Sequence, residues 1–178
     1  MISPFEAAAV LVTLAAVYLT AREVVWCWPL SLVSVTMYAV IFFEAKLYAD
    51  AGLQVFYFAL SLYGWWSWLH GGDEHGALEV SAASWRLRVA LAGLGTAFAL
   101  LLGWTLARYT DASLPFMDSA LTSFSLVAQF LAARKMIDNW IVWMIVDVFY
   151  VGMFVLKDLE LTAGLYGVFL VLAVVGWR

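Results

Sequence analysis

The chain has 178 residues, of which 66% are hydrophobic and only 12% charged, and this composition excludes an ordinary soluble domain. Apolar runs of about 18 residues or more in such a chain are typical of an integral membrane protein. The net charge of -4, from 13 acidic and 9 basic residues, leaves no basic patch for nucleic acid, and the single Cys27 excludes an internal disulfide.

Seven apolar segments follow one another along the chain, each about as long as a membrane-spanning helix. Their continuous apolar character favours helices over the alternating strands of a membrane barrel. The only sizeable polar connection, residues 70–84, lies between the third and fourth segments. The sequence therefore predicts an all-α integral membrane protein with one transmembrane domain over residues 1–178. The predicted segments are 5–20, 24–43, 49–69, 86–108, 115–132, 139–156 and 160–177.

An internal repeat becomes visible when 112 is added to the number of each residue in 1–66, without any gap. The coinciding residues include Arg22 and Arg134, Trp28 and Trp140, Tyr38 and Tyr150, and the Gly-Trp pairs at 64–65 and 176–177. Each repeat holds three segments, and the segment 86–108 carries the chain back across the membrane between them. The two repeats, about 1–69 and 113–178, are therefore expected to be parallel, in a 3+1+3 arrangement typical of transporters. The first segment has its counterpart inside the chain, so we expect it to belong to the fold and not to a cleaved signal peptide.

Basic residues are distributed unevenly between the two sets of connections. One set holds Arg22, Arg86, Arg88, Arg134, Lys135 and Arg178, and the opposite set holds Lys46, Arg108 and Lys157. Because cytoplasmic connections carry an excess of Lys and Arg, we expect the C-terminus in the cytoplasm and the N-terminus outside.

The sixth segment contains a carboxylate, Asp147, near its centre, where burial costs about 2.5–3.5 kcal/mol on insertion scales. A structural ion pair would be the ordinary explanation, but no Lys or Arg lies at comparable depth in any predicted segment. Asn139, Trp143 and Tyr150 lie three or four residues apart around Asp147 and share its helix face. This face is therefore a candidate substrate site.

Two further segments carry a polar and aromatic stripe. The third segment has Gln54, Tyr57, Ser61, Trp65 and Trp68, and the fifth has Thr122, Ser125 and Gln129. Tryptophans near segment ends are often interfacial, but the alignment of Trp65 and Trp68 with Gln54 and Tyr57 favours a place in the site. Serine and threonine commonly bond within membrane helices, so only Gln129 of the fifth segment is a candidate contact. If the three stripes face one another, they form a cavity.

The residue types in these stripes indicate the ligand. Aromatic rings with a carboxylate favour a flat cation, and amide side chains match a carboxamide or a ring edge. No metal-ligand spacing, phosphate loop or nucleophile–base pair accompanies them, so we expect no metal, no cofactor and no enzyme activity. An intramembrane enzyme using Asp147, or a purely structural subunit, fits these stripes less well than a transporter.

Residues 54–71 and 128–178 closely resemble the PnuC family of nicotinamide riboside transporters. The resemblance rests on Trp65, Trp68, Gln129, Asn139, Trp140, Trp143 and Asp147, and extends over nearly the whole chain. It implies a seven-helix core similar to SWEET sugar transporters, facilitated diffusion without ion coupling, and trapping of the substrate by cytosolic phosphorylation. It also implies a homotrimer in the bacterial inner membrane. The closest alternative is a sibling transporter for another planar vitamin such as thiamine.

The repeat predicts that the site is asymmetric. With the 112-residue offset, Gln129, Asn139 and Asp147 correspond to Val17, Cys27 and Val35. The second repeat thus supplies the amides and the carboxylate, whereas the first supplies chiefly aromatic side chains. We therefore expect substrate selectivity to respond more strongly to changes in the second repeat.

Overall fold

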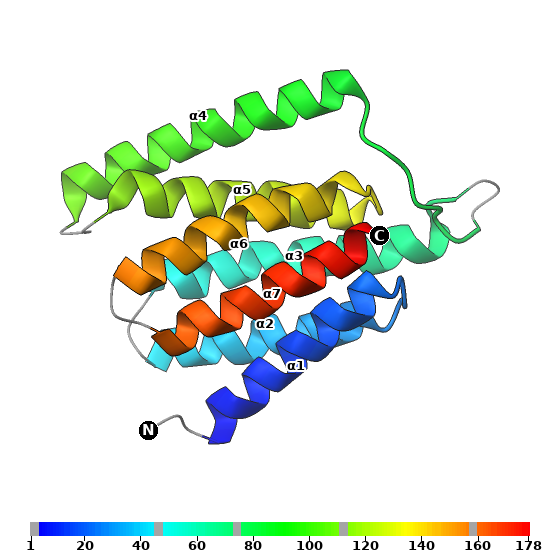
Figure 1. Ribbon diagram of the computed structural model, residues 1–178, viewed down its shortest axis with the longest axis horizontal. Coiled ribbons are helices and arrows are strands. Elements are labelled where there is room, and N and C mark those ends of the chain that lie inside the picture. Colours follow the sequence, from blue (N-terminus) through cyan, green and yellow to red (C-terminus); the bar gives the residue numbers. More distant parts are fainter. Residues whose placement is uncertain (1–3, 45–47, 73–75, 111–113, 157–159) are drawn as a thin grey trace. The chain divides into compact units, whose positions relative to one another are not determined.

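The computed structural model describes residues 4–44, 48–72, 76–110, 114–156 and 160–178, which form seven α-helices (Figure 1). The helices are α1 (Pro4–Ala21), α2 (Cys27–Glu44), α3 (Tyr48–His70), α4 (Trp85–Tyr109), α5 (Pro115–Ala133), α6 (Asp138–Leu156) and α7 (Glu160–Trp177). Each predicted segment matches one helix to within three residues at either end. The all-helical fold class with seven helices is therefore confirmed.

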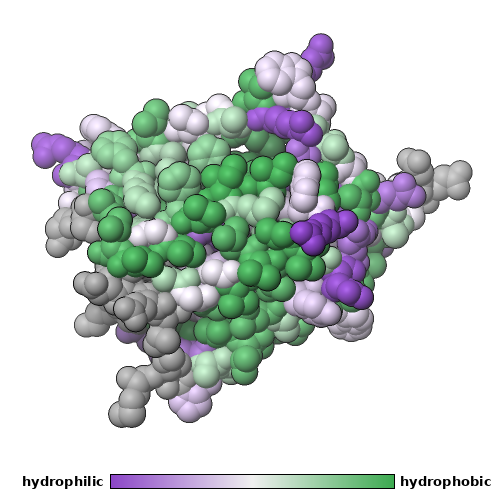
Figure 2. Space-filling model, viewed as in Figure 1, coloured by the Kyte–Doolittle hydropathy of each residue, from purple (hydrophilic) through white to green (hydrophobic). Residues whose placement is uncertain are grey.

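The surface of these helices is unusually apolar. Three of them, α1, α4 and α5, are long and apolar enough over the described residues to cross a membrane, and α2 and α7 contain shorter apolar stretches. Large side chains such as Leu94, Leu101 and Leu156 are between 62% and 79% exposed. Figure 2 shows apolar side chains over much of the visible face. Exposed apolar surface on this scale suits contact with lipid rather than water.

The chain divides into two compact units. The first comprises residues 1–80, 133–135 and 175–178, and the second comprises 81–132 and 136–174. The first unit therefore holds α1, α2 and α3, and the second holds α4, α6, nearly all of α5 and most of α7.

In the first unit, the core forms around two tryptophans, Trp28 and Trp68, whose rings meet edge to face at 5.4 Å between centroids. Gly64 of α3 lies against the Trp28 indole so closely that an added Cβ would be 2.3 Å from Cη2. Across α1 and α2, the hydroxyls of Thr13 and Ser34 are hydrogen-bonded. Small residues and paired hydroxyls thus allow these helices to approach closely, as in other membrane helix pairs.

Lys135 joins three connections of the first unit. Its Nζ lies 3.3 Å from Oε2 of Glu23, in the turn between α1 and α2, and donates to the Leu78 carbonyl at 3.1 Å. The same ammonium lies 4.9 Å from the centroid of the Trp68 ring. The α1–α2, α3–α4 and α5–α6 connections therefore meet at one end of this unit.

In the second unit, α4 packs on α5 through small residues. Gly95, Ala99 and Gly103 are spaced four apart and buried, and the Ser123 hydroxyl of α5 donates to the Gly95 carbonyl at 2.7 Å. A Cβ on Gly103 would lie 2.6 Å from the Phe116 ring. On the other side of α5, Leu121 packs in a core with residues of α6, namely Val146 and Met153.

The turns after α1 and α5 share one backbone geometry. Glu23 and Lys135, which the 112-residue offset pairs, both adopt a positive φ, 55° and 52°. The residue after each donates its amide to a carbonyl five residues earlier at 2.9 Å. These bonds are Val24 to Leu19 and Met136 to Leu131. A left-handed residue that ends a helix is ordinarily glycine, and here it recurs at two equivalent non-glycine positions. We therefore propose that the two repeats derive from one duplicated unit.

We expect Gly64→Ala to destabilise the protein, because its methyl group would overlap the Trp28 indole. Overpacking of this kind costs about 1–3 kcal/mol, so the melting temperature of the purified protein in detergent should fall. Gly52→Ala is the matched control on α3, since no atom of the described residues lies within 4 Å of the added Cβ. Alanine should leave the melting temperature unchanged or raise it there. Equal melting temperatures for the two variants would contradict the close packing of Trp28 on α3.

Candidate functional site

The predicted face of α6 carries two buried polar side chains. Asn139 and Asp147 are 5% and 3% exposed, respectively. Trp143 and Tyr150 are half-buried and pack against the core of Leu121, Val146 and Met153. These four predicted site residues therefore belong to one helix, and their polar members are shielded from the surface.

Asp147 has neither a hydrogen bond nor an ion pair among the described residues. A carboxylate that is buried without a partner is costly in any protein and more so in a membrane. In soluble and membrane proteins alike, such a group indicates a functional site, where a ligand supplies the missing interaction. The structure thus agrees with the sequence in giving Asp147 no basic partner.

The side-chain amide of Asn139 has a hydrogen bond at its nitrogen but none at its oxygen. Its Nδ2 donates to the Met136 carbonyl at 2.7 Å, whereas its Oδ1 is buried with no hydrogen-bond partner in the described structure. Leaving a buried acceptor unpaired costs about 1–3 kcal/mol, so Asn139 Oδ1 is a candidate acceptor for a donor on a ligand. The free acceptor on Asn139 is suited to an N–H group.

Gln129 lies near the end of α5 and is half-buried. On α3, Gln54 and Tyr57 are also half-buried, while the Ser61 hydroxyl is fully buried with no hydrogen-bond partner among the described residues. No role of its own is predicted for Ser61, because serine in a membrane helix commonly bonds the preceding turn. Its unpaired hydroxyl adds it to the candidate contacts of α3.

The two predicted tryptophans of α3 lie in different environments. Trp68 is 6% exposed, packs on Trp28 and has the Lys135 ammonium against its ring. Trp65 is 36% exposed. Both remain predicted ligand contacts, but Trp68 already belongs to the core of the first unit, whereas Trp65 is the more accessible ring.

Tyr166 of α7 is an aromatic neighbour that sequence reasoning missed. Its ring lies 4.5 Å from that of Tyr150, between centroids, and meets Phe169 edge to face at 5.6 Å. It extends the aromatic surface next to the α6 face within the second unit. The 112-residue offset pairs Tyr166 with Gln54, so the repeat contained a signal that could have identified it.

Buried polar groups without partners, on helices whose outer surface is apolar, are features of a helical membrane transporter. The chain belongs to the family described as nicotinamide mononucleotide transporter, which matches residues 3–178. The predicted family membership is therefore confirmed, and the protein is a multi-pass membrane transporter for a vitamin and not an enzyme.

Characterised relatives transport two different vitamins. The chain is 31% identical over 181 aligned positions to the nicotinamide riboside transporter PnuC of Escherichia coli K12, covering 88% of this chain and 76% of that protein. It is 32% identical over 133 positions to the riboflavin/roseoflavin transporter RibM of Streptomyces davaonensis, covering 71% and 60%. A crystal structure of the vitamin B3 transporter PnuC has the same fold, with a TM-score of 0.73 at 19% identity over 95% of this chain and 77% of that one.

The environments of Trp65 and Trp68 predict different effects on stability. Trp68→Ala removes a ring from a packed core, which typically costs about 3–5 kcal/mol, and should lower the melting temperature in detergent markedly. Trp65→Ala lies at a more exposed position and should lower it much less. Equal destabilisation by the two substitutions would contradict the assignment of Trp68 to the core.

Proposed function

We propose that this protein takes up nicotinamide riboside by facilitated diffusion. The observation that carries the proposal is the α6 face, on which a buried amide oxygen and a buried carboxylate both lack partners among the described residues. Nicotinamide riboside carries a carboxamide and a cationic pyridinium ring. Its carboxamide N–H group is the donor that Asn139 Oδ1 lacks, and its positive charge is complementary to Asp147.

The spacing of the two groups supports a ligand that reaches both. Eight residues separate Asn139 from Asp147, so they lie about 12 Å apart along the helix axis, at 1.5 Å per residue. A nucleoside is of comparable length and can present its carboxamide at one end. Trp143 and Tyr150 lie on the same face and offer aromatic surface to the ring. With the carboxamide at Asn139, the ribose hydroxyls at the far end of the ligand can donate to the Asp147 carboxylate. The pyridinium charge lies on the same ring as the carboxamide, so Asp147 acts on it at longer range or through a neighbouring side chain.

One relative is a riboflavin transporter, so riboflavin is the main competing substrate. Thiamine, which is a planar cation, is a further candidate. Riboflavin is flat but uncharged, so it would leave the Asp147 carboxylate without a counter-charge. Thiamine supplies a charge, and its aminopyrimidine N–H group could also donate to the Asn139 oxygen. Nicotinamide riboside matches both groups and is the substrate named for the relative that covers 88% of this chain, and for these two reasons together we prefer it.

Facilitated diffusion is the transport mode we propose, because the predicted spans offer few ionisable side chains for coupling to an ion. Apart from Asp147, the predicted spans place no ionisable side chain near mid-membrane depth, so neither a proton relay nor a sodium site of several oxygens is evident from the sequence. The substrate gradient alone then drives uptake. Phosphorylation in the cytosol would maintain this gradient by removing free nicotinamide riboside.

We also propose that the C-terminus faces the cytoplasm and the N-terminus lies outside, and that the protein is a homotrimer. The contacts of Lys135 with Glu23 and Leu78 bring the three connections of this set together at one end of the first unit, and the orientation rests on their basic residues. That set of connections contains six of the nine basic residues. Of the opposite set, Lys46 and Lys157 lie outside the described residues.

The function is tested by reconstituting the purified protein in liposomes and following labelled nicotinamide riboside. We expect uptake to stop when the internal and external concentrations are equal, and excess riboflavin or thiamine to compete poorly. Transport of riboflavin in preference to nicotinamide riboside would overturn the proposed substrate. Accumulation above the external concentration, driven by an imposed proton or sodium gradient, would overturn facilitated diffusion.

Asp147→Asn separates charge recognition from hydrogen bonding. If the carboxylate contacts the cationic ligand, the variant should lose about tenfold or more in affinity for nicotinamide riboside and less for its reduced, uncharged form. Calorimetric titration of both ligands measures the difference. Asp118→Asn, an exposed position in the first turn of α5, is the control and should bind like wild type.

Equal losses for the two ligands would assign Asp147 an orienting role instead of a direct charge contact. If Asp147→Asn and Asp147→Ala both bind and transport like wild type, the carboxylate has no part in recognition.

A further inference from the structure

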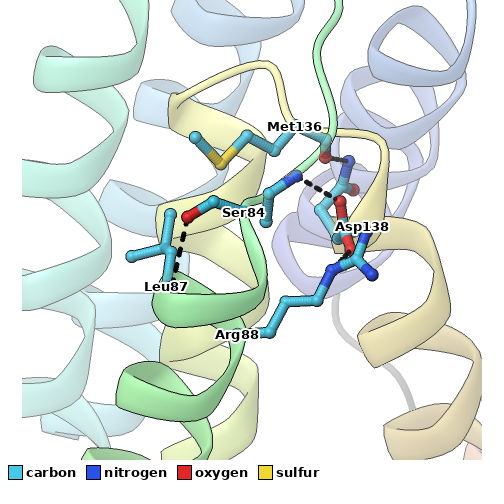
Figure 3. Close-up of polar contacts among 7 residues, drawn as sticks. Ser84, Leu87, Arg88, Met136 and Asp138 are labelled. Atoms are coloured by element: carbon cyan, nitrogen blue, oxygen red, sulfur yellow. Dashed lines mark hydrogen bonds and ion pairs between the residues drawn. The ribbon is translucent and has the colours of Figure 1, made fainter.

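The joint between the start of α4 and the start of α6 is built around Asp138. This residue begins α6, and its side chain is 11% exposed. Its Oδ1 lies 2.7 Å from Nε of Arg88, and its Oδ2 accepts the Ala83 amide hydrogen at 2.7 Å (Figure 3). In contrast to Asp147, both carboxylate oxygens of Asp138 have partners.

The backbone adds to this joint. The Ile137 amide donates to the Ser81 carbonyl at 2.8 Å, and Ser81 forms a β-bridge with Met136. Ser84, three residues further on, caps α4 by accepting the Leu87 amide at 3.3 Å. The segment that leads into α4 is therefore fastened to the segment that leads into α6.

Asn139 is held by this same joint. Its Nδ2 donates to the carbonyl of Met136, the residue that Ser81 contacts (Figure 3). An asparagine amide can present either its oxygen or its nitrogen to a given neighbour, and the neighbouring donors and acceptors select between them. Because the Met136 carbonyl accepts only a donor, Nδ2 must face it, and Oδ1 is left pointing away as the unpaired buried acceptor.

We propose that Asp138 and Arg88 are positioning residues for substrate recognition, which act by fixing the Asn139 amide with its oxygen toward the carboxamide of the ligand. This inference rests on the proposed function, in which Asn139 binds nicotinamide riboside. Arg88 and the Ala83 amide hold Asp138, the Ile137–Ser81 bond holds the backbone next to Met136, and the Met136 carbonyl accepts from Asn139. Neither Asp138 nor Arg88 touches the substrate in this arrangement.

The first repeat shows that the backbone turn can form without a carboxylate, so the role we assign to Asp138 is to hold this turn against the start of α4. The equivalent turn has the same amide-to-carbonyl bond, from Cys27 to Val24 at 3.0 Å, as the one from Asn139 to Met136. The offset places Trp26, which is 66% exposed, at the position of Asp138. The carboxylate and the amide thus occur together in the second repeat and are both missing from the first, although the backbone turn forms in each.

Two variants test the proposal by calorimetric titration of the full-length protein in detergent, with nicotinamide riboside and nicotinic acid riboside as probes. The second probe has a carboxylate in place of the carboxamide, so it offers no donor to Asn139 Oδ1. Wild type should prefer nicotinamide riboside.

Asp138→Ala and Arg88→Gln should each reduce that preference about fivefold or more, because the Asn139 amide can then rotate. Arg86→Gln, at an exposed position on the same turn of α4, is the matched control and should keep the wild-type preference.

A double-mutant cycle distinguishes action through Asn139 from general stabilisation. The double variant Asp138→Ala with Asn139→Ala should bind nicotinamide riboside no more weakly than Asn139→Ala alone, since Asp138 acts only through Asn139. Arg88→Gln serves the same cycle if Asp138→Ala does not fold, because the Arg88 side chain is 56% exposed.

The possible results separate this inference from the proposed function. Losses that add in the cycle, or an unchanged preference between the two probes, would overturn the positioning role while leaving the proposed function intact. A wild-type protein that does not bind nicotinamide riboside at all would overturn both.

Discussion

The hydrocarbon core of a membrane contains no water, so every polar atom placed there must find a partner within the protein or be reserved for a ligand. Several polar side chains of the described helices meet this requirement locally. The hydroxyls of Thr20 and Thr105 donate to carbonyls four residues earlier, and Ser123 bonds to α4. Buried polar atoms without a partner among the described residues occur at Trp28, Ser61, Ser119 and Asn139. We propose that Asn139 Oδ1, together with the unpaired carboxylate of Asp147 on the same helix, is kept for a substrate.

The two aspartates of α6 show how the same chemical group serves two purposes. Asp138 lies at the start of the helix, where an arginine and a backbone amide satisfy both of its oxygens. Asp147 lies nine residues later, about 13 Å further along the axis at 1.5 Å per residue, with no partner. The first fixes the end of the helix in place, and the second remains available for recognition.

We propose that duplication of one three-helix unit produced the common backbone of the two repeats. The turns after α1 and α5 share the left-handed residue and the hydrogen bonds that follow it. Their side chains have diverged, since Cys27 and Val35 stand where the second repeat has Asn139 and Asp147. In the first repeat, the equivalent of Asn139 is buried in the core beside Trp28. One copy therefore retains packing at these positions, while the other has gained polar groups.

The helices could be predicted closely because the length of an apolar run and the polar residues at its ends are local properties. The residues that share one face of α6 could also be predicted, because side chains three or four positions apart lie on the same side of any α-helix. The difference between Trp65 and Trp68 could not, since burial of Trp68 depends on Trp28 and Lys135, which come from other elements. The contact between Arg88 and Asp138 was missed for the same reason, because spacing within one helix does not show how α4 and α6 are aligned.

In the proposed mode of recognition, the Asn139 oxygen accepts a hydrogen bond from the carboxamide of the substrate. An experimental structure of the protein with nicotinamide riboside bound would show this bond or its absence. We expect the carboxamide nitrogen about 3 Å from Asn139 Oδ1, with Nδ2 still bonded to the Met136 carbonyl. A bound ligand whose carboxamide contacts other groups, with Asn139 Oδ1 still unpaired, would rule out this mode of recognition.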